Sequence, residues 1–202
     1  MLFDKDFNLK IADFGLAAKF KNEKGLIPLK DLCGTQNYIA PEMLAKSLYN
    51  GAAIDVFSCG VVLFILMAGH PPFYAANPYK DPFYCMIANQ HYIAFWEAFE
   101  TQLGKTFSPE FKDLVQSMLS MAPSERPTIK MIKEHPWFNG AVLSSEEMKE
   151  ALGGLKEKVD EIRFQERQKE KEKAAKAKAL AKKMQEEKFN VPLAFTGVRI
   201  KK

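Results

Sequence analysis

The chain of 202 residues is 47% hydrophobic and 12% aromatic, which is enough for a core, and its length suggests one domain with an appendage or two small domains. Its three cysteines, Cys33, Cys59 and Cys85, form no Cys-x-x-Cys pair, which argues against a disulfide framework or a zinc site and favours a reducing compartment, the cytoplasm or alternatively the nucleus. The formal net charge of +4 comes from the C-terminal part, because residues 1–155 hold 14 basic and 17 acidic side chains and residues 156–202 hold 15 basic and 8 acidic ones.

The first expected element is a β-hairpin. Phe7, Leu9 and Ile11 alternate with polar residues, the period-2 pattern of a half-buried strand, and Leu2-Phe3 precedes them across a polar turn. Residues 16–39 show no clean period and are interrupted by glycine and proline, so they predict a long loop. Loops of this length in a compact domain are usually functional or disordered.

A buried helix is expected next. From Asp55 to Ala68 the sequence is apolar nearly all round, so the helix should be buried on every face. Asp55 can cap its start and Gly69 its end. The longest apolar run, Val61 to Ala68, is shorter than the roughly 18–20 residues that a bilayer requires, and no membrane span is expected.

Three later helices have start signals in the sequence. Asp81-Pro82, Ser108-Pro109 and Thr128 each precede a segment with apolar residues at helical spacing, and the last segment ends at His135-Pro136. One hairpin followed by helices predicts an α+β fold that is mainly α.

The composition changes after Gly153-Gly154. We expect a linker over 141–154, a charged Lys/Glu/Ala helix over 155–188, and a basic tail over 189–202 to which no structure is assigned. Opposite charges three or four residues apart favour a solvated helix. The expected pairs are Glu166–Lys169, Glu170–Lys173 and Glu172–Lys176. A coiled coil requires three or more heptads, whereas Leu152, Leu155, Val159 and Ile162 supply about one and a half.

Lysines of this helix suit an acidic partner. The residues are Lys176, Lys178, Lys182 and Lys183. Because no aromatic residues are interleaved and eight acidic residues lie in the same region, nucleic acid is not expected and a helix with solvated charges is the favoured alternative.

Several motifs follow one another along residues 1–140. Asp13-Phe14-Gly15 comes after the strand, and Cys33-Gly34-Thr35 leads to Ala40-Pro41-Glu42. The later motifs are Asp55-Val56-Phe57-Ser58-Cys59-Gly60, Gly69-His70-Pro71-Pro72-Phe73, Glu125-Arg126-Pro127-Thr128 and His135-Pro136-Trp137-Phe138. With these landmarks in this order, residues 1–140 resemble the C-terminal lobe of a Ser/Thr protein kinase, most closely the calcium/calmodulin-dependent and AMP-activated-like branch.

The resemblance implies functions for the segment between Asp13 and Glu42. Asp13 matches the ligand of the magnesium ion that bridges the phosphates of ATP. Thr35 stands where Ser/Thr-specific members place a hydroxyl that contacts the catalytic aspartate. Asp31 stands where relatives carry an activating phosphothreonine, so we hypothesise that its carboxylate replaces the phosphate; a solvated loop aspartate is an equal alternative.

Two further implied roles are structural. Glu42 matches the partner of Arg126 in a buried ion pair, whose disruption would cost about 3–5 kcal/mol. Asp55 matches the residue that anchors the backbone of the catalytic loop. The alternatives are ordinary surface charges for the pair and a simple helix cap for Asp55.

Other parts of a kinase site are missing from the 202 residues. They contain no glycine-rich loop, no phosphate-binding lysine with its glutamate partner, no His-Arg-Asp catalytic base and no asparagine for a second magnesium ion. In the family, the residue that closes the catalytic loop would fall just before Met1, so we expect an N-terminal truncation and assign no catalytic residue here. Because phosphoryl transfer needs all its parts together, the chain alone is expected to be inactive. It is also expected to be marginally stable, with one face of the helix at 55–68 uncovered.

Two functions therefore compete. The first is the C-terminal part of an enzyme that transfers phosphate from ATP with magnesium to protein substrates. The second is a non-catalytic binding or regulatory protein with a kinase-like lobe and a charged helical tail. The presence of Asp13, Thr35, Glu42, Asp55 and Arg126 favours an active parent enzyme.

Overall fold

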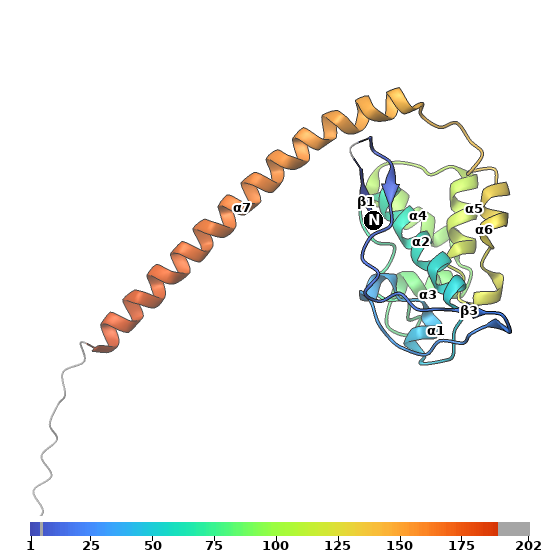
Figure 1. Cartoon of the computed structure of the whole chain (residues 1–202), viewed down its shortest axis with the longest axis horizontal. Helices are drawn as coiled ribbons and strands as arrows, with labels where there is room; N and C mark the ends of the chain where they lie inside the picture. Colours follow the sequence, from blue (N-terminus) through green and yellow to red (C-terminus); the bar gives the residue numbers. More distant parts are fainter. Residues whose placement is uncertain (5, 190–202) are drawn as a thin grey trace, which may run out of the picture. The chain divides into compact units, whose positions relative to one another are not determined.

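The computed structural model describes the backbone of residues 1–4 and 6–189 and the side chains of residues 1–4 and 6–177. It contains two compact units, one of Met1–Lys10 with the segment from Leu143 onward, the other of Ile11–Val142. The predicted α+β fold with mainly helical content is confirmed (Figure 1). Residues 190–202 of the basic tail expected over 189–202 lie outside the described residues.

Helix α2 (Gly51–Ala68) runs through the middle of the larger unit and packs on α5 (Pro109–Met118) (Figure 1). The two helices approach closely at Gly60, where a Cβ atom would lie 2.9 Å from Cβ of Met118. The helix begins four residues before Asp55, because the side chain of Asn50 accepts a hydrogen bond from the amide of Ala52. The prediction that Asp55 caps this helix is therefore wrong.

The core beside α2 is aromatic. Phe64 lies at its centre and meets Phe99 edge to face at 4.9 Å between ring centroids. Other members of this core cluster come from α3 (Pro82–Ala88), α4 (Tyr92–Leu103) and α5. Helix α4 was not predicted, because His91 at its start supplies no side-chain cap; it ends at Gly104, whose φ of 62° stops the helix.

One face of α2 is open. Ala52, Asp55, Cys59 and Leu66 recur three, four and seven residues apart, and all are exposed; Leu66 reaches 76%. The prediction from the apolar composition that α2 is buried on every face is therefore wrong for this chain. The separate expectation that one face of this helix is uncovered is confirmed. The composition of a helix does not say which neighbours cover it.

Helix α2 is also the one described helix long and apolar enough to cross a membrane by length and composition, with 18 residues and a mean hydropathy of 2.2. The run is longer than the sequence indicated because the helix starts at Gly51. A core helix of a soluble protein has the same two properties, and 39% of this segment is buried inside the unit. These properties alone therefore do not indicate a membrane span.

The other predicted helix starts are confirmed. Asp81 accepts hydrogen bonds from the amides of Phe83 and Tyr84, each at 3.0 Å, and thereby caps α3. Ser108 caps α5, and Thr128 caps α6 (Ile129–Glu134), which ends at His135 as predicted. Short helical turns complete this unit: η1 (Gln36–Tyr38), α1 (Pro41–Leu44) and η2 (Pro123–Glu125).

The segment predicted as a structureless loop holds a small hairpin. Strands β3 (Lys21–Asn22) and β4 (Gly25–Leu26) pair antiparallel. The turn forms because the side chain of Asn22 accepts from the amide of Lys24 and because Gly25 takes a φ of 120°.

The smaller unit contains the predicted N-terminal hairpin, β1 (Leu2–Phe3) and β2 (Leu9–Lys10), with Leu2 opposite Lys10. Asp4 closes its turn by accepting from the amides of Asp6 and Asn8. The strand is shorter than the alternating pattern indicated, and it is exposed rather than half-buried, with Leu9 57% exposed.

Helix α7 (Ser145–Phe189) starts inside the segment predicted as a linker over 141–154 and continues through the two glycines. Ser144 and Glu147 form a capping box: the hydroxyl accepts from the Glu147 amide at 3.2 Å, and the carboxylate accepts from the Ser144 amide at 2.8 Å. This Ser-x-x-Glu signal is present in the sequence and was overlooked. None of the three charge pairs expected within residues 166–176 is within 4.0 Å, consistent with the small gain that exposed pairs offer against side-chain entropy.

Candidate functional site

Asp13 lies in a turn with left-handed backbone geometry, at a φ of 65°. Its Oδ1 accepts from the amide of Gly15 at 3.3 Å, which stabilises this conformation, and the side chain is exposed. Among the described residues, no group of three or more His, Cys, Asp or Glu side chains could hold a metal ion. Asp13 can therefore supply one carboxylate ligand, and the remaining ligands would have to come from elsewhere.

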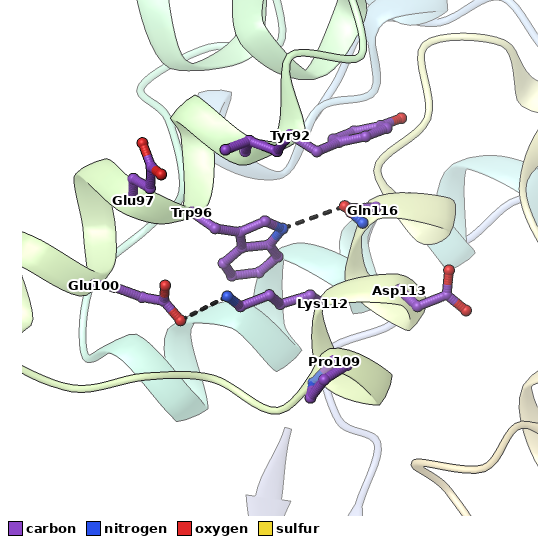
Figure 2. A pocket seen from close by; sticks show the side chains of 9 residues that line it. Tyr92, Trp96, Glu97, Glu100, Pro109, Lys112, Asp113 and Gln116 are labelled. Carbon is purple, nitrogen blue, oxygen red and sulfur yellow. Dashed lines mark hydrogen bonds and ion pairs between the residues drawn. The ribbon is translucent and has the colours of Figure 1, made fainter.

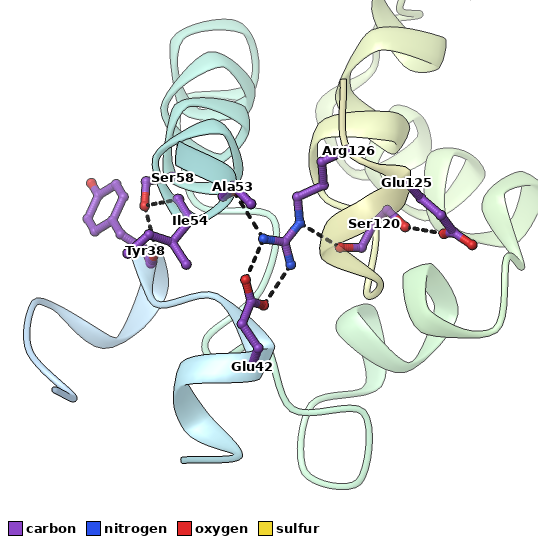
Figure 3. Close-up of polar contacts among 8 residues, drawn as sticks. All are labelled: Tyr38, Glu42, Ala53, Ile54, Ser58, Ser120, Glu125 and Arg126. Carbon is purple, nitrogen blue, oxygen red and sulfur yellow. Dashed lines mark hydrogen bonds and ion pairs between the residues drawn. The ribbon is translucent and has the colours of Figure 1, made fainter. Parts of the chain in front are cut away.

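The segment from Gly15 to Pro41 is attached to the helical body by three side chains that sequence reasoning did not single out. Tyr49 donates from its hydroxyl to the carbonyl of Asp31 at 2.6 Å. Asn37 donates from its amide to the carbonyl of Phe73 at 3.2 Å, and Ser58 donates to the carbonyl of Tyr38 at 2.9 Å (Figure 3). Desolvation raises the pKa of the Tyr49 hydroxyl, so it stays protonated and able to donate.

Thr35 and Asp31 both lie exposed on this segment. Thr35 precedes η1 and does not cap it with its side chain. The carboxylate of Asp31 makes no hydrogen bond or ion pair with another described residue; only its backbone carbonyl is engaged. The substitution of a phosphate by Asp31 stays a hypothesis.

Glu42 and Arg126, 84 positions apart in the sequence, form a buried two-pronged ion pair (Figure 3). Both guanidinium–carboxylate distances are 2.7 Å, and the side chains are 10% and 1% exposed respectively. Parallel bonds of this kind match the planar fork of arginine to the carboxylate. Glu42 lies in α1, directly after Ala40-Pro41, and Arg126 directly follows η2, so the ion pair joins these two segments.

Arg126 uses two more of its five N–H donors. It donates to the carbonyl of Ala53 in α2 and to that of Ser120, both at 3.0 Å, and its guanidinium carbon lies 4.9 Å from the ring centroid of Phe57. A charge removed from water is tolerated only with such compensation. The Arg126 side chain therefore links three parts of the helical body. The alternative interpretation, that Glu42 and Arg126 are ordinary surface charges, does not fit this buried pair.

Asp55 lies inside α2 on its open face, and no described residue donates a hydrogen bond to its carboxylate. Desolvation by partial burial raises the pKa of this carboxyl above its ordinary value. The structure thus brings Glu42 and Arg126 together, whereas Asp13, Asp31, Thr35 and Asp55 make no direct side-chain contact with one another.

Comparison with known proteins shows where this arrangement belongs. The family model of the protein kinase domain matches residues 1–138, so the chain belongs to the protein kinase domain family. It is similar to CBL-interacting protein kinase 11 of Oryza sativa subsp. japonica, with 39% identity over 144 residues, 70% of this chain and 26% of that protein. It is also similar to CBL-interacting serine/threonine-protein kinase 14 of Arabidopsis thaliana, with 39% identity over 138 residues, 68% of this chain and 29% of that protein.

The matched segment contains all the landmarks described above, and it confirms the resemblance to a kinase of this branch. The chain spans little more than a quarter of the length of these curated relatives. The helices α1 to α6 and their loops therefore correspond to the C-terminal lobe of a kinase domain.

Proposed function

We propose that residues 1–140 form the substrate-side lobe of a Ser/Thr protein kinase, which transfers the γ-phosphate of ATP to hydroxyl groups of protein substrates. The observation that carries this proposal is the buried Glu42–Arg126 pair. It fixes the C-terminal end of the segment that begins at Asp13, so that Thr35 is presented on a rigid helical base. Phosphoryl transfer is mainly positioning and charge stabilisation, and such a base supplies positioning.

Magnesium and ATP are the implied cofactors of this reaction. Magnesium would supply neutralisation of the charge on the transferred phosphate, and Asp13 would be one of the residues that hold it. Asp13 fits this use as one oxygen ligand, because its carboxylate is exposed and an ionised carboxylate suits a hard cation. The turn held by the Gly15 amide fixes the direction of that carboxylate.

The 202 residues alone are proposed to be inactive. They contain no His-Arg-Asp base and no glycine-rich loop, so they can neither accept the substrate proton nor hold the nucleotide by backbone amides. The test is transfer of radioactive phosphate from ATP to a Ser/Thr peptide library, with and without magnesium. We expect no transfer above that of the Asp13→Asn variant, and magnesium-dependent transfer that this substitution abolishes would contradict the inactivity.

The activity of a longer polypeptide is tested separately. Reading the transcript in frame upstream of the Met1 codon shows whether it encodes the missing parts. If it does, the extended protein should phosphorylate Ser/Thr peptides, and Asp13→Asn should reduce its kcat by at least about a hundredfold, since electrostatic groups of this kind contribute that much. Full activity of this variant would refute the function of Asp13.

A second candidate function is binding through α7, favoured by its separate unit and its exposed charged side chains. Lys176 is exposed, whereas the side chains of Lys178, Lys182 and Lys183 lie outside the described part. We propose an acidic protein as the partner and the cytoplasm as the compartment. Titration with an acidic peptide, which should bind less tightly as salt rises, tests this function independently of catalysis.

A further inference from the structure

The cavity between α4 and α5 has a volume of about 490 Å³, within the range of ligand sites. Its floor lies over Trp96, which is only 3% exposed and whose ring nitrogen donates to Oε1 of Gln116 at 3.3 Å (Figure 2). Lys112 lies with its Nζ 5.8 Å from the centroid of the Trp96 ring. Tyr92 and Ile93 also line the cavity, and Ile93 is 78% exposed. The cavity therefore presents the half-buried ring of Tyr92 and an exposed apolar edge at Ile93.

The single lysine of this cavity is already paired. Lys112 lies 2.7 Å from Glu100, and the same carboxylate accepts from the amide of Phe107 at 2.8 Å. The hydrogen bonds from Lys112 and from this amide lower the pKa of the Glu100 carboxyl, so the pair is ionised and its charges cancel at neutral pH. Glu100 and Lys112 are thus part of the wall of the cavity and contribute no net charge.

Two further carboxylates leave the cavity negative. Glu97 makes no hydrogen bond or ion pair with any described residue, and Asp113 contacts only the ring of His135, at 3.1 Å. Figure 2 shows them on either side of the Trp96 ring in this view. The cavity thus combines aromatic rings, an exposed aliphatic side chain and two carboxylates with unused acceptor capacity.

We propose that this cavity binds an arginine-bearing peptide segment of another protein. A guanidinium is flat, so it can stack on the half-buried ring of Tyr92 while its five donors reach a carboxylate in a two-pronged contact. An apolar residue beside the arginine packs on Ile93. A lysine offers the same charge but neither the flat surface nor the fork, so it binds more weakly. Charge complementarity selects this occupant, because Glu97 has no hydrogen-bond or ion-pair partner among the described residues and Asp113 contacts only His135.

The experiment measures fluorescence anisotropy of a fluorescein-labelled peptide of alternating arginine and leucine, titrated with the 202-residue chain. Matched peptides replace arginine with lysine or with neutral citrulline. The variants are Glu97→Gln and Asp113→Asn, and the control is Glu23→Gln, which removes the same charge from the exposed turn of the β3–β4 hairpin. Circular dichroism verifies that each variant is folded.

Each cavity variant should weaken binding of the arginine peptide about three- to fivefold, as expected for a partly exposed charge contact. The control should leave it unchanged, and citrulline should abolish it. The lysine peptide should bind at least about threefold less tightly. Equal binding by the citrulline or lysine peptide, unchanged binding by both cavity variants, or a Kd weaker than about 1 mM would overturn the proposal. The assay involves no catalysis, so its failure leaves the proposed kinase function standing.

Discussion

Replacing Glu42 by alanine leaves Arg126 buried without its anion. The side chain of Arg126 is 1% exposed, and it loses two hydrogen bonds of 2.7 Å. Removing one partner of a buried pair costs about 3–5 kcal/mol. Because the carbonyls of Ala53 and Ser120 and the ring of Phe57 still compensate the charge, we expect the lower end, about 3 kcal/mol. This is a large share of the roughly 5–15 kcal/mol that stabilises a domain.

The assay is urea unfolding followed by tryptophan fluorescence. Trp96 and Trp137 are the two tryptophans of the chain, and both belong to the larger unit, so the signal reports the unfolding of that unit. With a slope of about 2 kcal/mol per molar urea, the midpoint should fall by about 1.5 M. Glu23→Gln, an exposed carboxylate in a turn, should change the free energy of unfolding by less than about 0.5 kcal/mol.

A double variant separates the ion pair from simple loss of packing. Glu42→Ala combined with Arg126→Met removes the uncompensated charge, so it should be less destabilised than the sum of the two single variants by at least about 1 kcal/mol. Additive effects, or a loss below about 1 kcal/mol for Glu42→Ala alone, would refute the reasoning that the buried charge dominates.

Four other substitutions follow from the same structure. Gly60→Ala should lower the free energy of unfolding by about 1–3 kcal/mol in the same urea assay, because the new methyl group meets α5; a neutral effect would show that the helices can separate. The pKa of Glu100 is lower in the folded protein than its unfolded-state pKa of 4.5. The ionised carboxylate therefore stabilises the fold above pH 4.5, and this contribution is lost as the pH falls through the folded-state pKa. Glu100→Gln should therefore be less stable than wild type at pH 7, and the difference should shrink below pH 4.5; a difference that persists in acid would contradict this. Gly153→Ala and Gly154→Ala should each increase the helix signal in circular dichroism and stabilise α7 by about 1 kcal/mol, because both positions are open to an added Cβ; a weaker signal would indicate that the helix breaks there.

Local signals explain which helix starts could be predicted. Asp81, Ser108 and Thr128 each bond an amide two or three residues further along, so the residue and its partner stand together in the sequence. The same short spacing between a capping side chain and its backbone amide would have identified Ser144 and Glu147 as the start of α7. Helix α4 has no such cap at His91, and its existence depends on the packing of Phe95, Trp96 and Phe99 into the core.

The sequence by itself determined the family, because short motifs such as Asp13-Phe14-Gly15 keep their residues and order regardless of what surrounds them. It also suggested Glu42 and Arg126 as partners, through the resemblance to the kinase lobe and not through any spacing rule. Only the tertiary structure decided that the carboxylate and guanidinium meet at 2.7 Å, that one face of α2 is open, and that α4 and α5 line an open cavity with acidic side chains. Burial and long-range contacts depend on which elements pack together, and no pattern within one helix contains that information.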